Sequence, residues 1–180
     1  MSSYHYLPET WVSPKQDIRP SPIQGMGIFA GQTIKQGEAV EIIGGQVMSE
    51  VEFEMFQRNT PLYNAVQIGE GLHLVELLNN TYNRKGSLNH SCDSNLWMAD
   101  AVTIVARFEI AMGQELTVDY ALFTSQSHWI MDSMCQCGTV VCRKTITGND
   151  WKLRGFQERY QNHFSPYLNE RINQFRMLHP

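Results

Sequence analysis

The sequence predicts a mainly β fold followed by C-terminal helices. Short segments in which apolar and polar residues alternate, separated by glycine-containing turns, occupy most of the chain between residues 34 and 118, a pattern typical of strands. Beyond residue 149 the apolar spacing changes to three and four, which indicates amphipathic helices. The chain has 180 residues, 42% of them hydrophobic and 18% charged. It is therefore long enough for one folded domain and too apolar for a disordered one.

The first 22 residues predict an extended arm, because their prolines are excluded from helix and sheet interiors: Pro8, Pro14, Pro20 and Pro22. The arm has no apolar core of the kind that a secretory signal peptide needs, and no stretch is apolar for the ~18 residues of a membrane span. We therefore expect a soluble intracellular protein, cytoplasmic in a bacterium or nuclear in a eukaryote. The net charge of −4 gives no reason to expect nucleic-acid binding and mildly favours a basic partner.

Between residues 34 and 118 we expect strands, tight turns and one helix. The expected order is two short strands within 34–48, a hairpin over 65–75, a loop over 79–87, two strands within 96–110 and a last strand at 116–118. Ser49 and Glu52 form a capping box, which predicts a helix from Glu50 to about Arg58.

Two helices are predicted at the C-terminus. Asn149 is expected to cap the first, whose apolar stripe consists of Leu153, Phe156, Tyr160 and Phe164. Ser165 and Pro166 end that helix and begin a second one, because serine is a good N-cap and proline fits the first helical turn. The stripe of the second helix consists of Leu168, Ile172 and Phe175. We interpret both stripes as core packing.

The four cysteines predict a structural metal site. Cys135, Cys137 and Cys142 lie close together on a glycine-containing loop, and Cys92 is the only other cysteine in the chain. Four thiolates complete the closed tetrahedral coordination of structural zinc. His128 could compete with Cys92 as the fourth ligand, and the alternative for the set is four free buried thiols. The tight clustering favours the metal.

Two further segments carry groups suited to ligand binding. Asn89 and His90 stand beside Cys92 in a short polar stretch, and both side chains form directional hydrogen bonds. Gly25 and Gly27 let the backbone approach a ligand closely. A third glycine is missing, so this is not a dinucleotide-binding motif, and by itself the segment is equally typical of a turn before a strand. We expect the active site in the cleft that Cys92 closes with the later cysteines.

Taken together, these segments resemble the SET-domain protein-lysine N-methyltransferases, in particular the small stand-alone members, bacterial ones among them. The family's four motifs occur in order: Gly25-Met26-Gly27 with Phe29-Ala30, Asn89-His90-Ser91-Cys92, Gly113-Gln114-Glu115-Leu116 through Asp119-Tyr120, and the post-SET cysteines. The resemblance implies a β-clip of several small curved sheets, with the Asn89–His90 segment threaded beneath the C-terminal loop as a pseudoknot. It divides the chain into an N-terminal arm (1–22), a SET domain (23–122), a post-SET zinc loop (123–148) and a C-terminal helical extension (149–180).

The resemblance also implies an activity. S-adenosyl-L-methionine would donate a methyl group to the ε-amine of a lysine in a protein or peptide substrate, such as a histone, and a structural Zn²⁺ would be held by the four cysteines. Tyr120 would be the catalytic residue, orienting the amine with its hydroxyl and ring. The alternatives are a catalytically silent, zinc-stabilised peptide-binding module with the same fold, or a zinc-stabilised interaction domain without cofactor. The presence of Tyr120, Asn89 and His90 favours the enzyme.

The resemblance assigns roles to further residues. The cofactor would be bound by Gly25, Met26 and Gly27 through their main chain and by Asn89 and His90. Trp151 would either cover the adenine or pack in the helical core. Tyr63 and Val118 would line the lysine channel, and Val118 stands where many members have an aromatic residue linked to the number of methyl groups added. Gly86-Ser87 replaces an Arg-aromatic pair of many members. The substrate protein and the oligomeric state do not follow from the sequence.

Overall fold

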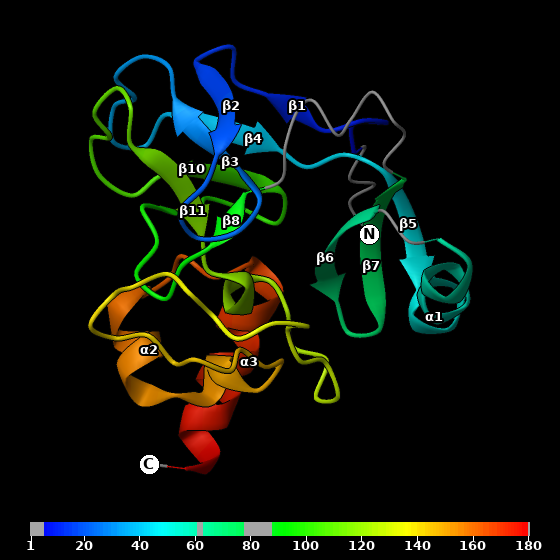
Figure 1. Cartoon of the computed structure of the whole chain (residues 1–180). Coiled ribbons are helices and arrows are strands. Elements are labelled where there is room, and N and C mark those ends of the chain that lie inside the picture. Colours follow the sequence, from blue (N-terminus) through cyan, green and yellow to red (C-terminus); the bar gives the residue numbers. More distant parts are fainter. Residues whose placement is uncertain (1–5, 61–62, 78–87, 180) are drawn as a thin grey trace.

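The computed structural model describes residues 6–60, 63–77 and 88–179. In Figure 1 two small sheets lie together in the upper part of the molecule, a third sheet with one helix stands beside them, and the C-terminal helices lie below. The described part of the chain is thus mostly β with a few C-terminal helices, as the sequence predicts.

The first sheet consists, in spatial order, of β1 (Trp11–Val12), β4 (Ala39–Ile42), β10 (Thr103–Ala106) and β9 (Leu96–Met98). All its neighbours are antiparallel, and Ile104 of β10 lies opposite Glu41 of β4. Directly paired residues point to the same face of a sheet. Glu41 and Ile104 therefore share a face, and this face borders the cavity described below.

The second sheet brings the sequence motifs together. Its spatial order is β2 (Gln16–Pro20), β3 (Met26–Ala30), β11 (Glu115–Val118) and β8 (Asn89–His90). Strand β11 is antiparallel to β3 and parallel to β8, with Thr117 opposite Asn89 and Val118 opposite His90. The three motifs, which are separated by up to ninety residues of sequence, thus lie on adjacent strands.

The third sheet, β5 (Gln46–Ser49), β7 (Leu72–Leu77) and β6 (Tyr63–Gly69), carries helix α1 (Glu50–Asn59). The predicted capping box is confirmed: the Ser49 side chain accepts from the Glu52 amide, and the Glu52 carboxylate accepts from the Ser49 amide. The predicted hairpin is confirmed as the antiparallel pair β6–β7. The loop expected over 79–87, including Gly86-Ser87, lies outside the described residues.

The N-terminal arm contributes to two of these sheets. Residues 11–12 and 16–20 form the edge strands β1 and β2, and β2 pairs with β3 along its full length. Pro20 ends the edge strand β2, where its missing N–H removes no hydrogen bond from a sheet interior. Extended backbone was predicted for this arm. Its pairing with β3 and β4 was not predicted, because these partner strands lie further along the chain.

The C-terminal region differs from the prediction of one continuous helix after Asn149. The chain forms the 3₁₀ turn η3 (Asp150–Lys152) and the short helix α2 (Arg154–Arg159), and Asn149 makes no side-chain cap. Leu153 interrupts them with extended backbone and is 48% exposed. The left-handed φ of 61° at Asn162 precedes the next helix. The apolar spacing therefore reflects separate turns that pack on one core.

The second predicted helix is confirmed as α3 (Pro166–Leu178). The Ser165 side chain accepts from the Leu168 amide, and Pro166 occupies the first turn. Leu168 and Ile172 are buried in the main core, together with Phe156, Tyr160 and Phe164. Among the described residues, every helix is too short or too polar to cross a bilayer.

Candidate active site and metal centre

The side chain of Asn89 joins the motifs of the second sheet. Its Nδ2 donates to the carbonyl oxygens of Gln24 and Met26, at 3.1 and 3.4 Å, and to Oε1 of Glu115 at 2.8 Å. Asn89 is buried, so these bonds replace the water that the amide would otherwise contact. The amide of Asn89 therefore holds the turn before β3 in place.

That turn requires its two glycines. A Cβ on Gly27 would overlap the Glu115 carboxylate, to which Ser21 Oγ also donates at 2.8 Å. Gly25 has a φ of 50°, a backbone conformation that residues other than glycine rarely adopt. Met26, between them, is 50% exposed. Glu115 was not among the predicted site residues, although it belongs to the Gly-Gln-Glu-Leu motif.

His90 is buried with both ring nitrogens engaged. Nε2 lies 3.3 Å from Cys92 Sγ, and Nδ1 accepts from the Tyr120 amide at 3.3 Å. Burial, and next to it the positive charge of Arg143, lowers the pKa of His90 to about 3. The imidazole is therefore neutral at physiological pH and connects the tyrosine to the cysteine cluster.

Tyr120 opens the 3₁₀ turn η2 (Tyr120–Leu122) directly after β11. Its hydroxyl donates to the Leu88 carbonyl at 2.9 Å, and its ring centroid lies 5.2 Å from that of His90. Burial raises the pKa of Tyr120 to about 12. The phenol is therefore protonated at neutral pH and held at both its backbone and its hydroxyl.

A cavity of about 320 Å³ lies where the three sheets meet, and Tyr120 lines it. Tyr63 and Val118, the predicted channel residues, line the same cavity. The aromatic residues around it are Phe53, Tyr63, Tyr120, Phe123 and Trp129. The hydroxyl of Tyr63 accepts from Gln57 Nε2 at 2.8 Å. The structure thus brings the candidate catalytic tyrosine and both candidate channel residues to one cavity, whose walls are partly aromatic.

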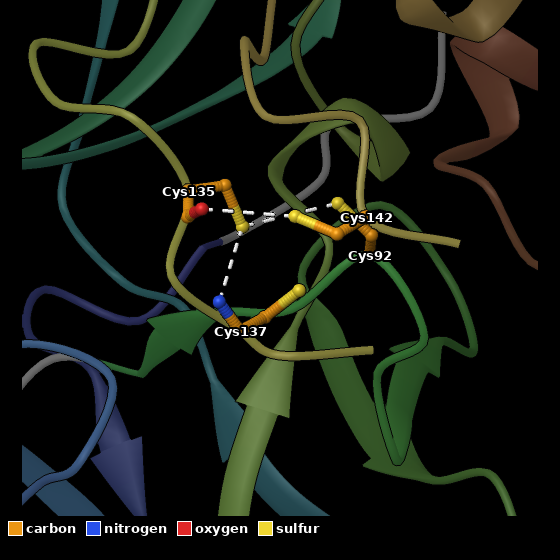
Figure 2. Close-up of side chains that lie close together, drawn as sticks. All are labelled: Cys92, Cys135, Cys137 and Cys142. Atoms are coloured by element: carbon orange, nitrogen blue, oxygen red, sulfur yellow. Dashed lines mark hydrogen bonds between the residues drawn. The ribbon is translucent and has the colours of Figure 1, made fainter. Parts of the chain in front are cut away.

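The four cysteines form one cluster (Figure 2). Their Sγ atoms all lie within 4.8 Å of one another, and Cys92 and Cys135 are 3.9 Å apart. A tetrahedral zinc site with Zn–S bonds of ~2.3 Å separates its sulfurs by roughly 3.8 Å, whereas a disulfide requires about 2.05 Å. The spacing fits a metal and all four cysteines are free of disulfides.

The surroundings of the cluster also suit thiolates bound to a cation. The amides of Arg143 and Cys137 donate to Cys92 Sγ and Cys135 Sγ, at 3.3 and 3.5 Å. Burial raises the pKa of the Cys135 thiol to about 12 and that of Cys92 as well. A bound cation would reverse this shift, since thiolates are the ligating form. His128 does not join the cysteines; its ring groups with Glu50 and Glu54.

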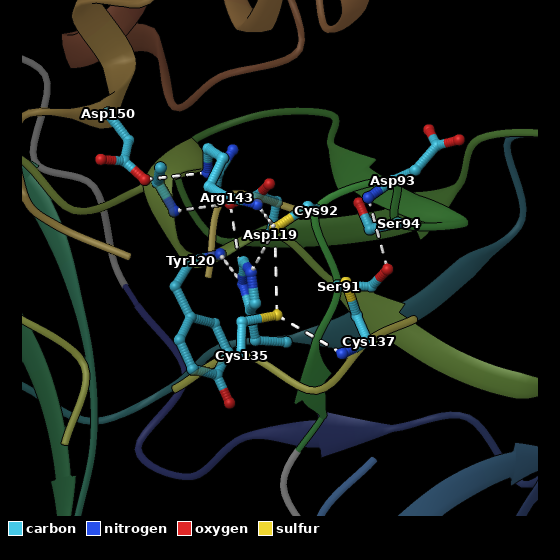
Figure 3. A network of polar contacts seen from close by, with 12 residues as sticks. Ser91, Cys92, Asp93, Ser94, Asp119, Tyr120, Cys135, Cys137, Arg143 and Asp150 are labelled. Carbon is cyan, nitrogen blue, oxygen red and sulfur yellow. Dashed lines mark hydrogen bonds and ion pairs between the residues drawn. The ribbon is translucent and has the colours of Figure 1, made fainter. Parts of the chain in front are cut away.

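An ion-pair network ties the cysteine segment to β11 (Figure 3). Arg143 Nη2 lies 2.7 Å from Oδ1 of the fully buried Asp119, and Arg143 Nε lies 2.9 Å from Asp150. Burial raises the pKa of Asp119 to about 6, against the opposite effect of Arg143. None of these three residues was predicted as a site residue, and Asp119 was named only as part of the motif that ends at Tyr120.

Trp151 is not brought to this site. It is buried and packs against Phe175 at a centroid distance of 5.5 Å, with the Arg171 guanidinium 5.1 Å from its ring. Of its two interpretations the structure supports the helical core. The threading of the Asn89–His90 segment stays a prediction. The structure shows residues 135–143 in contact with the ends of β8 and β11.

The chain is similar to parts of much longer proteins. Histone-lysine N-methyltransferase ATX2 of Arabidopsis thaliana is 26% identical over 165 residues, which cover 84% of this chain and 14% of that protein. Histone-lysine N-methyltransferase 2D of Homo sapiens is 29% identical over 160 residues, covering 79% of this chain and 3% of that protein. The chain therefore spans only a small part of the length of these curated relatives.

A solved structure and a family model also match this chain. The crystal structure of Arabidopsis thaliana SUVH6 in complex with SAM superposes with a TM-score of 0.57 and 20% identity, over 74% of this chain and 33% of that one. At this identity the likeness shows the fold alone. The model of the SET domain matches residues 25–121, more than half of the chain, from the glycine turn into η2. The chain belongs to the SET-domain family, that of the lysine methyltransferases its motifs resemble.

Proposed function

We propose that this protein transfers a methyl group from S-adenosyl-L-methionine to the ε-amine of a lysine in a protein substrate. One observation carries the proposal: Tyr120 belongs to two environments at once. Its ring lines the cavity with Tyr63 and Val118, while its amide is bonded to His90, beside the Asn89 side chain that holds the glycine turn. Methyl transfer needs such a junction, because donor and acceptor must approach in line from two sides.

The donor side would use main-chain atoms. The Asn89 amide and the His90 ring are engaged within the protein, so we assign them the positioning of the cofactor site. The exposed Gly25 and Met26 and the buried Gly27 would supply the remaining contacts through their main chain. S-adenosyl-L-methionine, when bound, supplies an activated methyl group on a sulfonium.

On the acceptor side the cavity must position a neutral amine. A free lysine has a pKa near ~10.4, and a dry, apolar environment disfavours its charged form. Val118 and the aromatic walls of the cavity provide this environment. The Tyr120 hydroxyl donates its hydrogen bond to the Leu88 carbonyl. Its oxygen can therefore accept a hydrogen bond from an amine N–H. Its ring would stabilise the cationic methylated product.

Zn²⁺ held by Cys92, Cys135, Cys137 and Cys142 would be structural, because four thiolates leave no coordination position open. We retain the division into an arm (1–22), a SET domain (23–122), a zinc loop (123–148) and a helical extension (149–180) as part of the proposal. Basic histone segments are the substrate class we favour, because the relatives are named for them and the net charge is −4.

The proposal is tested by transfer of an isotope-labelled methyl group to histones and to host lysate, with mass spectrometry of the labelled proteins. We expect label on lysine side chains, and calorimetry should show stoichiometric binding of the methyl donor. A protein that folds with zinc but releases no heat with S-adenosyl-L-methionine would contradict the proposal and leave the silent binding module in its place.

A further inference from the structure

The cavity contains a carboxyl group that the proposed chemistry has not used. Glu41 of β4 lines the cavity next to Ile43, and its pairing with Ile104, another lining residue, fixes the face to which it points. Glu41 is 8% exposed. Within the described part of the chain, no residue donates a hydrogen bond to its carboxylate, and its electrostatic neighbours are the acid Glu76 and the phenol of Tyr120.

Two ionisable groups on the neighbouring strand β7 have partners of their own. Glu76 on β7 accepts from both the amide and the hydroxyl of Thr10, at 2.9 and 2.6 Å. His73 on β7 is paired with Glu50 at 2.7 Å. Among the described lining residues there is no lysine or arginine. Among the lining residues that the structure describes, Glu41 is thus an acid with no cation beside it, in a cavity with five aromatic residues on its walls.

A carboxylate that is removed from water without a partner is costly, so it either takes up a proton or pairs with a cation. The missing cation has the size and chemistry of a lysine side chain, since the cavity holds about 320 Å³ and aromatic rings attract ammonium groups. We propose that Glu41 binds the substrate lysine ε-ammonium inside this cavity and accepts its proton before methyl transfer. The inference rests on the proposed function and adds a residue to it.

The proton and electron balance is simple. One N–H bond of the ammonium breaks and its proton forms an O–H bond on the Glu41 carboxylate, leaving the nitrogen lone pair free. The lone pair then forms the N–CH₃ bond as the C–S⁺ bond of the sulfonium donor breaks, and the product is a methylammonium. Glu41 returns its proton to solvent after the product leaves. Burial and Glu76 raise the pKa of Glu41 to about 8 in the empty cavity, and an ammonium beside the carboxyl group would lower it again, so that the carboxylate is the form that meets the amine. Tyr120, the other titratable group near Glu41, stays protonated.

The first test needs no catalysis. n-Butylammonium, a mimic of the lysine side chain, is titrated into carbon-13 glutamate-labelled protein, and the carboxyl resonances are followed by NMR. We expect the Glu41 resonance to move, and we expect Glu41→Gln to weaken amine binding by about tenfold or more. Glu109→Gln, at an exposed glutamate of the same sheet region, is the matched control and should bind as the wild type does. Equal affinity in Glu41→Gln and wild type, or no binding to the wild type, would overturn the proposal.

The second test separates this inference from the proposed function. In methyl-transfer assays, kcat/KM of Glu41→Gln should rise steadily with pH toward the amine pKa of ~10.4, whereas the wild type should level off earlier. Binding of S-adenosyl-L-methionine should be unchanged. If the wild type binds the amine through Glu41 but never transfers methyl groups, the proposed function fails and the Glu41 site stands. If both proteins methylate with the same pH profile, Glu41 has no role in deprotonation and the function stands.

Discussion

Tyr120 is constrained at two atoms. Its amide donates to His90 and its hydroxyl donates to the Leu88 carbonyl, so the ring cannot rotate away from the cavity without losing a buried hydrogen bond. Such losses cost about 1–3 kcal/mol each. The position of the phenol oxygen is therefore set by groups on β8 and just before it, and not by the substrate.

Tyr120→Phe should keep the affinity for S-adenosyl-L-methionine but lower turnover by one or more orders of magnitude, because the oxygen that orients the amine is removed. Single-turnover methyl transfer and calorimetry measure the two effects separately. The control is Tyr167→Phe, which removes a surface hydroxyl bonded to Glu70. Unchanged turnover in Tyr120→Phe would refute the role of the hydroxyl.

Glu41 should make stability depend on pH. Its pKa is about 8 in the folded protein against an ordinary value of 4.5, so between these two values the folded state holds a proton that the unfolded chain has lost. The free energy of unfolding therefore falls as pH rises through this window. Glu41→Gln removes this loss and should be more stable than the wild type at the top of the window, by about 2–5 kcal/mol. Urea unfolding at several pH values measures the difference in the free energy of unfolding between Glu41→Gln and the wild type. A difference that stays constant across this window would contradict a raised pKa of Glu41 in the folded protein.

At this scale the sequence identified residues more readily than their contacts. Asn89, His90 and Tyr120 were predicted as site residues. Only the structure shows that the Asn89 side-chain amide donates hydrogen bonds to the Met26 carbonyl and the Glu115 carboxylate. Glu41 was not predicted at all. In sequence it is a polar residue within a short strand and would normally face solvent, but in the structure it lines a cavity together with residues of β10 and β6, which lie far along the chain.

At the scale of elements, the loop that carries the later cysteines has little regular structure of its own. Residues 133–149 contain no helix or strand, and Cys135 and Ile146 are the members of its small buried cluster besides Cys92. A metal bound by four thiolates contributes on the order of 10–16 kcal/mol to the folding of such a segment. The loop should therefore depend on the ion far more than the sheets do.

Chelation should expose this difference in hydrogen exchange. We expect residues 133–151 to lose amide protection first, while β3, β10 and β11 remain protected, and we expect Zn²⁺ to restore the loop. A uniform loss of protection across the chain would contradict a local role of the metal.

Elements defined by local signals were predictable. The capping box at Ser49 and the Ser165–Pro166 start of α3 are confirmed because each depends on residues within one turn. The helix expected after Asn149 is wrong because its apolar spacing fits both a continuous helix and a series of short turns on a common core. Nothing in the local apolar spacing marks the extended backbone at Leu153 that separates the two turns.

At the scale of the whole molecule, Arg143 joins regions that are far apart in sequence. It pairs with Asp119 after β11 and with Asp150 at η3, and its amide donates to Cys92. Its guanidinium also lies 4.6 Å from the ring of Phe156 on α2. One residue thus connects the β core and the C-terminal helices through its side chain and the cysteine cluster through its amide.

Arg143→Met should destabilise the whole protein by about 3–5 kcal/mol, because it leaves Asp119 buried without its cation. Arg154→Met is the matched control: that arginine pairs with Glu158 on the surface, with its side chain 91% exposed, and pairs of this kind contribute about 0–1 kcal/mol. Thermal unfolding of both variants with zinc bound makes the comparison. Equal melting temperatures for the two would show that the Asp119 pair contributes nothing.

The separation of Cys92 from its three partners has a consequence for how the protein is made. A ribosome releases the sheets well before the segment that ends at Arg143. A nascent chain that has not yet reached Cys135 therefore carries Cys92 without the three later thiols and is unable to retain the ion. The metal centre can be completed only after every strand of the three sheets has been synthesised.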